Sequence, residues 1–467
     1  MIILGTNSIK DTGYDVANSC RFNRASSDNL TKTPSGDGDR QKWTTSLWIK
    51  RSLLGSTQHI FTAGTYSESI SIRDEKIYVQ VSNNNTTAHA IQSNRLLRDI
   101  SAWYHIVVAC DTTQGTAANR LKLYVNGVEE TSLALDQRSA ITQNMSTAIC
   151  GQFEHRFGID EGSTDYYSGY IAEAVLIDGQ QLAPDQFGEF DEDSGIWKPI
   201  DVSGLTFGTN GFYLDFEDSA ALGDDVSGNG NDFTVNNLTA VDQSIDTCTN
   251  NFATLNPLNS WGGAVLSEGN LKLTSTATAF DHTSATIHMN SGKWYMEFNQ
   301  VATSGGSAVA CFLAGTGEFQ NDQTSWISSE DGGFGIGMNG FKITDGVEED
   351  SNSFSAVSSG DIVQIAYDSD TGKAWFGINN SWLASGNPST NADPYFTSSK
   401  LQNNDVSLKL LTYTSNNTSI ANFGQDSSFA GTKTKQSNQD SNSQGNFFYA
   451  PPTDFLALNT KNLAEYG

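Results

Sequence analysis

Two carboxylates at spacing i, i+2 form the pair in this chain best suited to acid/base chemistry. Asp215 and Glu217 lie in the run FYLDFED, residues 212–218, which has the pattern of a strand. Because side chains alternate along a strand, both carboxylates are expected on one face. Such a pair could provide the acid and the base for cleavage of a glycosidic bond.

A second acidic stretch has the composition of a cation-binding loop. Residues 224–233, DDVSGNGNDF, supply oxygen atoms from Asp224, Asp225, Asn229, Asn231 and Asp232. Ca²⁺ prefers clustered oxygen ligands in flexible loops, so these residues form a candidate Ca²⁺ site. The alternative is a turn whose Asx side chains cap its own backbone amides. No other cofactor is expected.

Several aromatic side chains lie in stretches with the composition of loops. Exposed aromatic rings stack on sugar faces and anchor protein interfaces. The alternative is that they cover the ends of a β-sandwich. The candidate ligand-binding residues are Tyr166, Tyr167, Phe319, Trp326 and Trp382.

Histidine and cysteine spacing gives no support for a metal centre or a nucleophile. The six histidines show no H-x-x-x-H pattern, and His105 alternates with Tyr104 as a packed strand residue would. The five cysteines show no C-x-x-C spacing, and Cys110 and Cys311 follow apolar runs typical of buried strands. We therefore expect neither a disulfide framework nor a zinc site.

Composition favours many short strands. Only 17% of the 467 residues are charged and 43 are glycine, and no long stretch has helical apolar spacing. The expected fold class is all-β. The formal net charge of −27 would repel nucleic acids and anionic membrane surfaces, so neither is an expected partner. No segment is long and apolar enough for membrane insertion, and the apolar start at residues 1–5 is too short for a signal peptide.

The stretch 360–383, GDIVQIAYDSDTGKAWFGINNSWL, shows the local rules that the rest of the chain follows. Ile362, Gln364 and Ala366 alternate with Val363, Ile365 and Tyr367. The turn DSDTG at 368–372 and a second strand from Ala374 to Ile378 follow. This pattern predicts a β-hairpin.

The first half of the chain resembles a laminin-G-like domain of the concanavalin A type. The resemblance is carried by the Trp48 strand, the strand at 103–111, the segment LKLYVNG at 121–127 and the strand at 169–179. It implies an antiparallel jelly-roll sandwich over residues 20–240, completed by the strand and acidic turn at 212–233. Residues 1–19 are then an N-terminal arm.

The second half resembles a SPRY domain, a sandwich used mostly for binding partners. The segments GKWYMEF at 292–298, the hairpin at 360–383 and NFGQ at 422–425 carry this resemblance. The implied domain spans residues 261–430, after a linker at 241–260. Residues 431–446 are polar and predict a flexible loop, and the apolar segments up to 467 are expected to dock on a sheet or a neighbouring chain.

Concanavalin A-type glucanases carry a Glu-x-Asp-x-(x)-Glu motif, which this chain lacks because residue 219 is Ser. No catalytic residue is therefore assigned, and the chain is expected not to be an enzyme. A glycan-cleaving depolymerase on the first sandwich stays an alternative.

The opening stretch 5–23 and the closing PPxxFxALNTxNL resemble structural proteins of tailed bacteriophages. That resemblance implies a virion protein, made in the host cytoplasm, of a fibre, tail or head decoration. Expected partners are other virion proteins, a host surface glycan or receptor, and further copies of the chain in a homo-oligomer. A purely architectural role is a further alternative.

Overall fold

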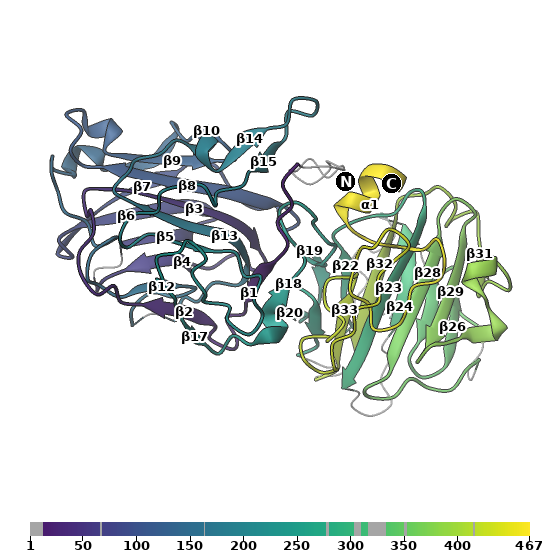
Figure 1. Cartoon of the computed structure of the whole chain (residues 1–467). Coiled ribbons are helices and arrows are strands. Elements are labelled where there is room, and N and C mark those ends of the chain that lie inside the picture. The colour runs from purple at the N-terminus through teal and green to yellow at the C-terminus, as the bar shows by residue number, and fades with distance from the viewer. Residues whose placement is uncertain are drawn as a thin grey trace. The chain divides into compact units, whose positions relative to one another are not determined.

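The computed structural model describes residues 13–65, 68–162, 164–276, 280–302, 310–315, 333–349, 353–413 and 416–467. The chain divides into two compact units, residues 4–250 and 251–467, here called the N-terminal and C-terminal units (Figure 1). Both are β-sandwiches, which confirms the all-β prediction. Within the described residues, no helix has the length and apolar character needed to cross a membrane.

The N-terminal unit has two main sheets. The first has the strand order β10 (Val128–Glu129), β9 (Leu121–Val125), β8 (Trp103–Asp111), β3 (Lys42–Arg51), β13 (Gly169–Asp178), β1 (Ser19–Phe22) and β18 (Gln243–Ser244), with β16 (Phe212–Leu214) also paired to β13. The second has the order β11 (Leu133–Asp136), β7 (Thr87–Ser93), β6 (Lys76–Asn83), β5 (Glu68–Arg73), β4 (Gln58–Ala63), β12 (His155–Phe157), β2 (Asn29–Lys32) and β17 (Thr234–Asn236). Their neighbouring strands are antiparallel.

The core of this unit lies between the two sheets. Leu121, Leu123 and Val125 of β9 are buried there, while Lys122 and Tyr124 alternate to the other face. The Asn126–Gly127 turn has positive φ at both residues, 48° and 77°, and joins β9 to β10 as predicted. The alternation of apolar residues in β9 therefore correctly predicted which of its side chains face the core.

The outer face of the first sheet is also covered. The hairpin of β14 (Gly188–Phe190) and β15 (Trp197–Pro199) places Trp197 on His105, and the Trp197 Nε1 donates to His105 Nδ1 at 2.9 Å. Burial lowers the pKa of His105 to about 3, so the ring is neutral and packed, as predicted. All five cysteines are buried and free of disulfides.

The C-terminal unit is a second sandwich. One sheet has the order β19 (Leu255–Trp261), β22 (Phe280–Ala285), β32 (Val406–Tyr413), β24 (Ala310–Gly315), β25 (Phe334–Gly337), β26 (Phe341–Thr344) and β27 (Val347–Glu348). The other has the order β20 (Val265–Ser267), β21 (Lys272–Thr274), β33 (Thr418–Asn422), β23 (Lys293–Ala302), β28 (Ile362–Asp368), β29 (Lys373–Ile378) and β30 (Ser381–Trp382). To these, β31 (Phe396–Thr397) pairs with β29, and β34 (Leu456–Ala457) pairs in parallel with β23.

The predicted hairpin at 360–383 is confirmed. Strands β28 and β29 pair from Val363 opposite Ile378 to Asp368 opposite Lys373, and the turn residues lie between them. A second turn with positive φ at Asn379 and Asn380 leads to β30. Ile365 and Phe376 are buried in the core between the two sheets.

Short helices complete both units. The 3₁₀ turns are Ala117–Asn119, Arg138–Ala140, Pro184–Gln186, Ala240–Asp242, Leu383–Ser385 and Pro388–Thr390, and the α-helix α1 spans Thr460–Tyr466. Asn459 caps α1, because its side chain accepts a hydrogen bond from the Asn462 amide.

The predicted linker at 241–260 does not exist as a separate segment. Residues 243–244 form β18 beside β1 and belong to the N-terminal unit, whereas β19 belongs to the C-terminal unit. The division falls between Asn250 and Asn251. A bridge between Phe252 and Asn459 then brings the start of the C-terminal unit beside its end.

Candidate functional site

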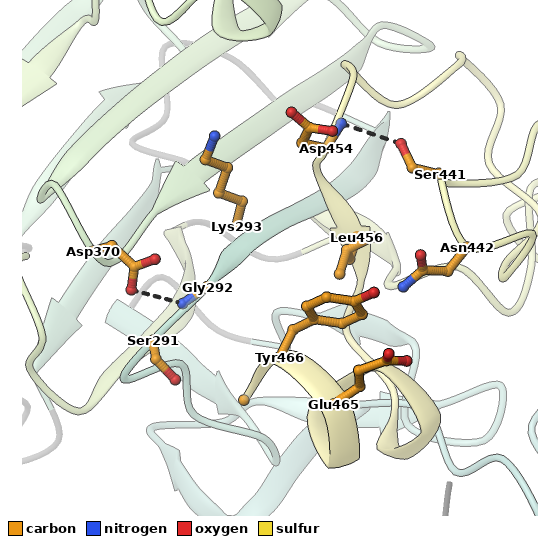
Figure 2. A pocket seen from close by; sticks show the side chains of 11 residues that line it. Ser291, Gly292, Lys293, Asp370, Ser441, Asn442, Asp454, Leu456, Glu465 and Tyr466 are labelled. Carbon is orange, nitrogen blue, oxygen red and sulfur yellow. Dashed lines mark hydrogen bonds between the residues drawn. The ribbon is translucent and has the colours of Figure 1, made fainter. Parts of the chain in front are cut away.

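A cavity of about 520 Å³ opens in the C-terminal unit (Figure 2). One wall comes from the sheet, at the start of β23 and the turn between β28 and β29. The other walls come from the segment 431–459, here called the tail, and from α1. Its lining residues are Ser291, Gly292, Lys293, Asp370, Ser441, Asn442, Asp454, Leu456, Glu465, Tyr466 and Gly467.

Hydrogen bonds between the turn after β28 and the residue before β23 fix the sheet wall of the cavity. Asp370, in the hairpin turn, accepts a hydrogen bond from the Gly292 amide at 3.0 Å, and the Ser369 amide donates to the Gly292 carbonyl at 2.9 Å. Gly292 has φ +77°, and a Cβ there would lie 2.7 Å from the Tyr466 carbonyl oxygen. Only glycine therefore fits between β23 and α1 without displacement.

The tail wall is organised by the carboxylate of Asp440. Its Oδ1 accepts from the amides of Asn442 and Gln444, and its Oδ2 accepts from the Ala457 amide and the Asn462 side chain, each at 2.8 Å. One carboxylate thus connects the loop at 441–444 to β34 and α1. The segment 431–446, predicted as a flexible loop, is held here by defined hydrogen bonds.

A second carboxylate attaches the tail to the sheet. Glu297 on β23 is fully buried and accepts from the amides of Phe448 and Tyr449, both at 2.8 Å. The Tyr295 hydroxyl and the side-chain amide of Asn422 also donate hydrogen bonds to this carboxylate. Burial nevertheless outweighs these bonds and raises the pKa of Glu297 to about 7. The tail therefore docks on the sheet of its own chain, one of the two predicted outcomes.

The cavity lining combines an aromatic ring with hydrogen-bonding groups. Tyr466 is 43% exposed, and Figure 2 shows it on α1 next to Glu465. Across the opening, the Lys293 ammonium lies 5.8 Å from the centre of the Phe455 ring. The Asp454 amide donates to Ser441 Oγ at 3.1 Å, which fixes the rim of the tail. An aromatic face with carboxylate, amide and hydroxyl neighbours suits a polar ligand with an apolar face.

The predicted Ca²⁺ loop is built as a self-capping turn. Asp225 is buried, and its carboxylate accepts from the amides of Tyr213, Ser227 and Asn231 at 2.7–3.0 Å. Asp232 in turn accepts from the Asp225 amide.

The other predicted ligands of this loop also have partners or face solvent. The side-chain amides of Asn229 and Asn231 both donate to the Gly211 carbonyl, and Asp224 is exposed. Partial desolvation and the neighbouring carboxylates raise the pKa of Asp224. Among the described residues, no three His, Cys, Asp or Glu side chains are grouped so that they could hold a metal. The Ca²⁺ site stays a prediction.

The structure describes three of the five predicted aromatic residues. Tyr167 is fully buried, and its hydroxyl donates to the Lys50 carbonyl at 3.0 Å, so its assignment as a surface ligand-binding residue was wrong. Tyr166 is half-buried in the N-terminal unit, and Trp382 is half-buried on β30 of the C-terminal unit. Phe319 and Trp326 lie outside the described residues.

The carboxylate pair at 215 and 217 is not on a strand. Strand β16 ends at Leu214, and Phe216 has φ +61°, so the predicted strand is interrupted there. Asp215 instead accepts from the Glu217 amide at 3.0 Å.

A carboxylate that the sequence did not indicate lies nearby. Glu173, at a bulge in β13 with φ +49°, accepts from the hydroxyls of Tyr14 and Tyr213. Burial and the charges of Asp215 and Glu217 raise its pKa to about 7. Its sequence context, IAEAV, looks like an ordinary strand.

Sequence reasoning also missed most of the cavity. The sequence predicts Gly292, Lys293 and Asp370 as strand and turn residues, and residues 431–446 as a flexible loop. The one available signal was the apolar and aromatic content of the segment after residue 446, which predicted docking.

Comparisons with known proteins agree with the fold. Residues 25–184 match the family model described as the concanavalin A-like lectin/glucanases superfamily. No curated protein matches the chain.

The solved structures that the chain matches include three at low identity. The SPRY domain of human HERC1 is 13% identical, with 36% of this chain and 96% of that chain covered and a TM-score of 0.29. A heptameric SAP-like pentraxin from Limulus polyphemus is 15% identical (37% and 81% covered, TM-score 0.28). A candidate carbohydrate-binding protein from Bacteroides ovatus is 14% identical (48% and 59% covered, TM-score 0.32). The N-terminal unit is thus similar, over residues 25–184, to concanavalin A-like lectins and glucanases.

Proposed function

We propose that this chain is a non-enzymatic binding protein whose cavity in the C-terminal unit takes a carbohydrate. The observation that carries the proposal is Tyr466, a partly exposed residue that lines a cavity of about 520 Å³ together with Asp370, Asp454 and Asn442. Sugars present an apolar face to aromatic rings and hydroxyls to carboxylates and amides. The match of residues 25–184 to a superfamily that includes lectins supports a binding role for the chain.

We also propose that the chain is carried on the surface of a virus particle. The resemblance of its opening and closing stretches to tailed-phage structural proteins supports a virion surface component that engages host glycans or a neighbouring virion protein. Repeated copies on a particle, or a homo-oligomer, would convert weak binding at one site into avidity.

The test is glycan-array binding by the full chain, followed by calorimetry on any glycan that binds. Tyr466→Ala should weaken binding by roughly five- to thirtyfold, because loss of an aromatic anchor removes roughly 1–2 kcal/mol. Tyr166→Ala is the matched control, since it removes a half-buried tyrosine from the N-terminal unit. A loss caused by Tyr166→Ala alone would place the site in the N-terminal unit. Silence of the whole array, with the cavity covered in an assembled particle, would favour an architectural role.

A glycan-cleaving activity is the second candidate, and Glu173 is the observation that favours it. Glu173 accepts from the hydroxyls of Tyr14 and Tyr213 near Asp215 and Glu217, and burial raises its pKa to about 7, so it is the carboxyl group to test as a general acid. New reducing ends released from a polysaccharide by the wild type, and lost in Glu173→Gln, would establish this activity. Glu192→Gln, an exposed change in the same unit, is the control.

A further inference from the structure

The charges around the cavity are unequal. Three carboxylates line the cavity, one from each wall: Asp370, Asp454 and Glu465 (Figure 2). Against these three negative charges, the lining residues contribute one ammonium group, that of Lys293. The formal charge of the whole chain, −27, has the same sign. A ligand approaching the opening therefore meets a negative potential.

The aromatic ring of Tyr466 also favours cationic ligands. The face of a tyrosine ring attracts cations, and 43% of Tyr466 is exposed. Lys293 starts on β23 and its ammonium lies by the Phe455 ring of the tail, while Glu465 and Tyr466 are consecutive on α1. The lining residues that the tail and α1 themselves contribute thus include two carboxylates and an aromatic ring, and the ammonium of Lys293 reaches the tail from the sheet.

We propose that the cavity selects ligands with protonated amines, and that the carbohydrate it takes contains amino sugars with free amino groups. This inference rests on the proposed carbohydrate-binding function. An exposed ion pair and an exposed cation–π contact each contribute modestly, and together they give a preference of about tenfold over the uncharged sugar.

The test compares two probes with the same sugar backbone, one with protonated amines and one with uncharged acetamido groups. Glucosamine tetramer and its fully N-acetylated counterpart have the same backbone and length, and their affinities for the full chain are measured by calorimetry in mildly acidic buffer. We expect the free-amine probe to bind about tenfold more tightly, with a preference that shrinks as salt is added. Asp454→Asn should reduce this preference, whereas Glu349→Gln, an exposed change elsewhere in the unit, should not.

Lys293→Gln should change the affinity for the free-amine probe in the direction opposite to that of Asp454→Asn. Removal of this ammonium should strengthen binding of the free-amine probe and leave the acetylated probe nearly unchanged. Equal affinity for both probes, with both weakened by Tyr466→Ala, would overturn the charge preference and leave the proposed function standing. Failure of both probes and of every array glycan to bind would overturn the two proposals together.

Discussion

The attachment of the tail through Glu297 leads to a sharp prediction for Glu297→Gln. The wild-type carboxylate can accept from the amides of Phe448 and Tyr449 at the same time, whether or not it is ionised. A glutamine amide has one acceptor oxygen, so its NH₂ group must face one of these two amides. One backbone donor is then left without an acceptor.

The magnitude follows from that single donor. An unsatisfied buried donor costs about 1–3 kcal/mol, and we take about 2 kcal/mol for the opening of the tail. Hydrogen exchange at Phe448 and Tyr449 should therefore accelerate roughly thirtyfold, since each factor of ten corresponds to about 1.4 kcal/mol. Because the tail supplies Asn442 and Asp454 to the cavity, ligand affinity should fall as well.

The assay is amide hydrogen exchange resolved to single residues, with Glu349→Gln as the control. The core amide of Ile365 should keep its protection in both variants, because it lies in the paired strands β28 and β29. Unchanged exchange at Phe448 and Tyr449 in Glu297→Gln would refute the idea that this carboxylate holds the tail. Faster exchange throughout the unit would show instead that the change acts on the whole fold.

Three further predictions concern Glu68, Gly292 and the predicted Ca²⁺ loop. Burial raises the pKa of Glu68 to about 7 from an ordinary value of 4.5, so the folded state binds this proton more tightly than the unfolded state. The stability that the protonated Glu68 contributes is present below pH 4.5 and is lost as the pH rises to 7. The difference in unfolding free energy between the wild type and Glu68→Gln should shift by roughly 3 kcal/mol across that window in urea titrations, and no shift would contradict the assignment. Gly292→Ala should lower Tm and weaken ligand binding, because it adds about 1–2 kcal/mol of left-handed strain and a backbone clash, whereas Gly360→Ala, at φ +90° with only the Lys433 side chain near, should show the strain alone. Chelation should leave Tm unchanged, because backbone amides already satisfy Asp225, and a fall in Tm that is absent from Asp225→Ala would establish the predicted Ca²⁺ site.

Local patterns predicted the strands and hairpins well. The alternation in β9, the Asn126–Gly127 turn and the Asp/Gly turn after β28 each follow from the preferences of a few adjacent residues. The resemblance to two sandwich families predicted that each half of the chain folds as an antiparallel sandwich. These features depend on short-range chemistry, which a single sequence displays.

The features that sequence reasoning missed depend on partners far along the chain. Tyr167 is buried because Lys50, 117 positions away, supplies an acceptor for its hydroxyl. The polar tail is held because Asp440 and Glu297 accept its amides, and polar composition alone resembles that of a mobile loop. The linker prediction failed because residues 243–244 pair with β1 more than 200 positions earlier. No local pattern carries that information.

The pairing of β1 with β18 has a consequence for how such proteins can be assembled in evolution. Strands at the start and the end of the N-terminal unit are neighbours, and Phe252 and Asn459 bridge the two ends of the C-terminal unit in the same way. A module whose entry and exit lie together can be inserted into a host loop, duplicated or exchanged without strain in the flanking backbone. Each sandwich therefore has the geometry of an interchangeable cassette.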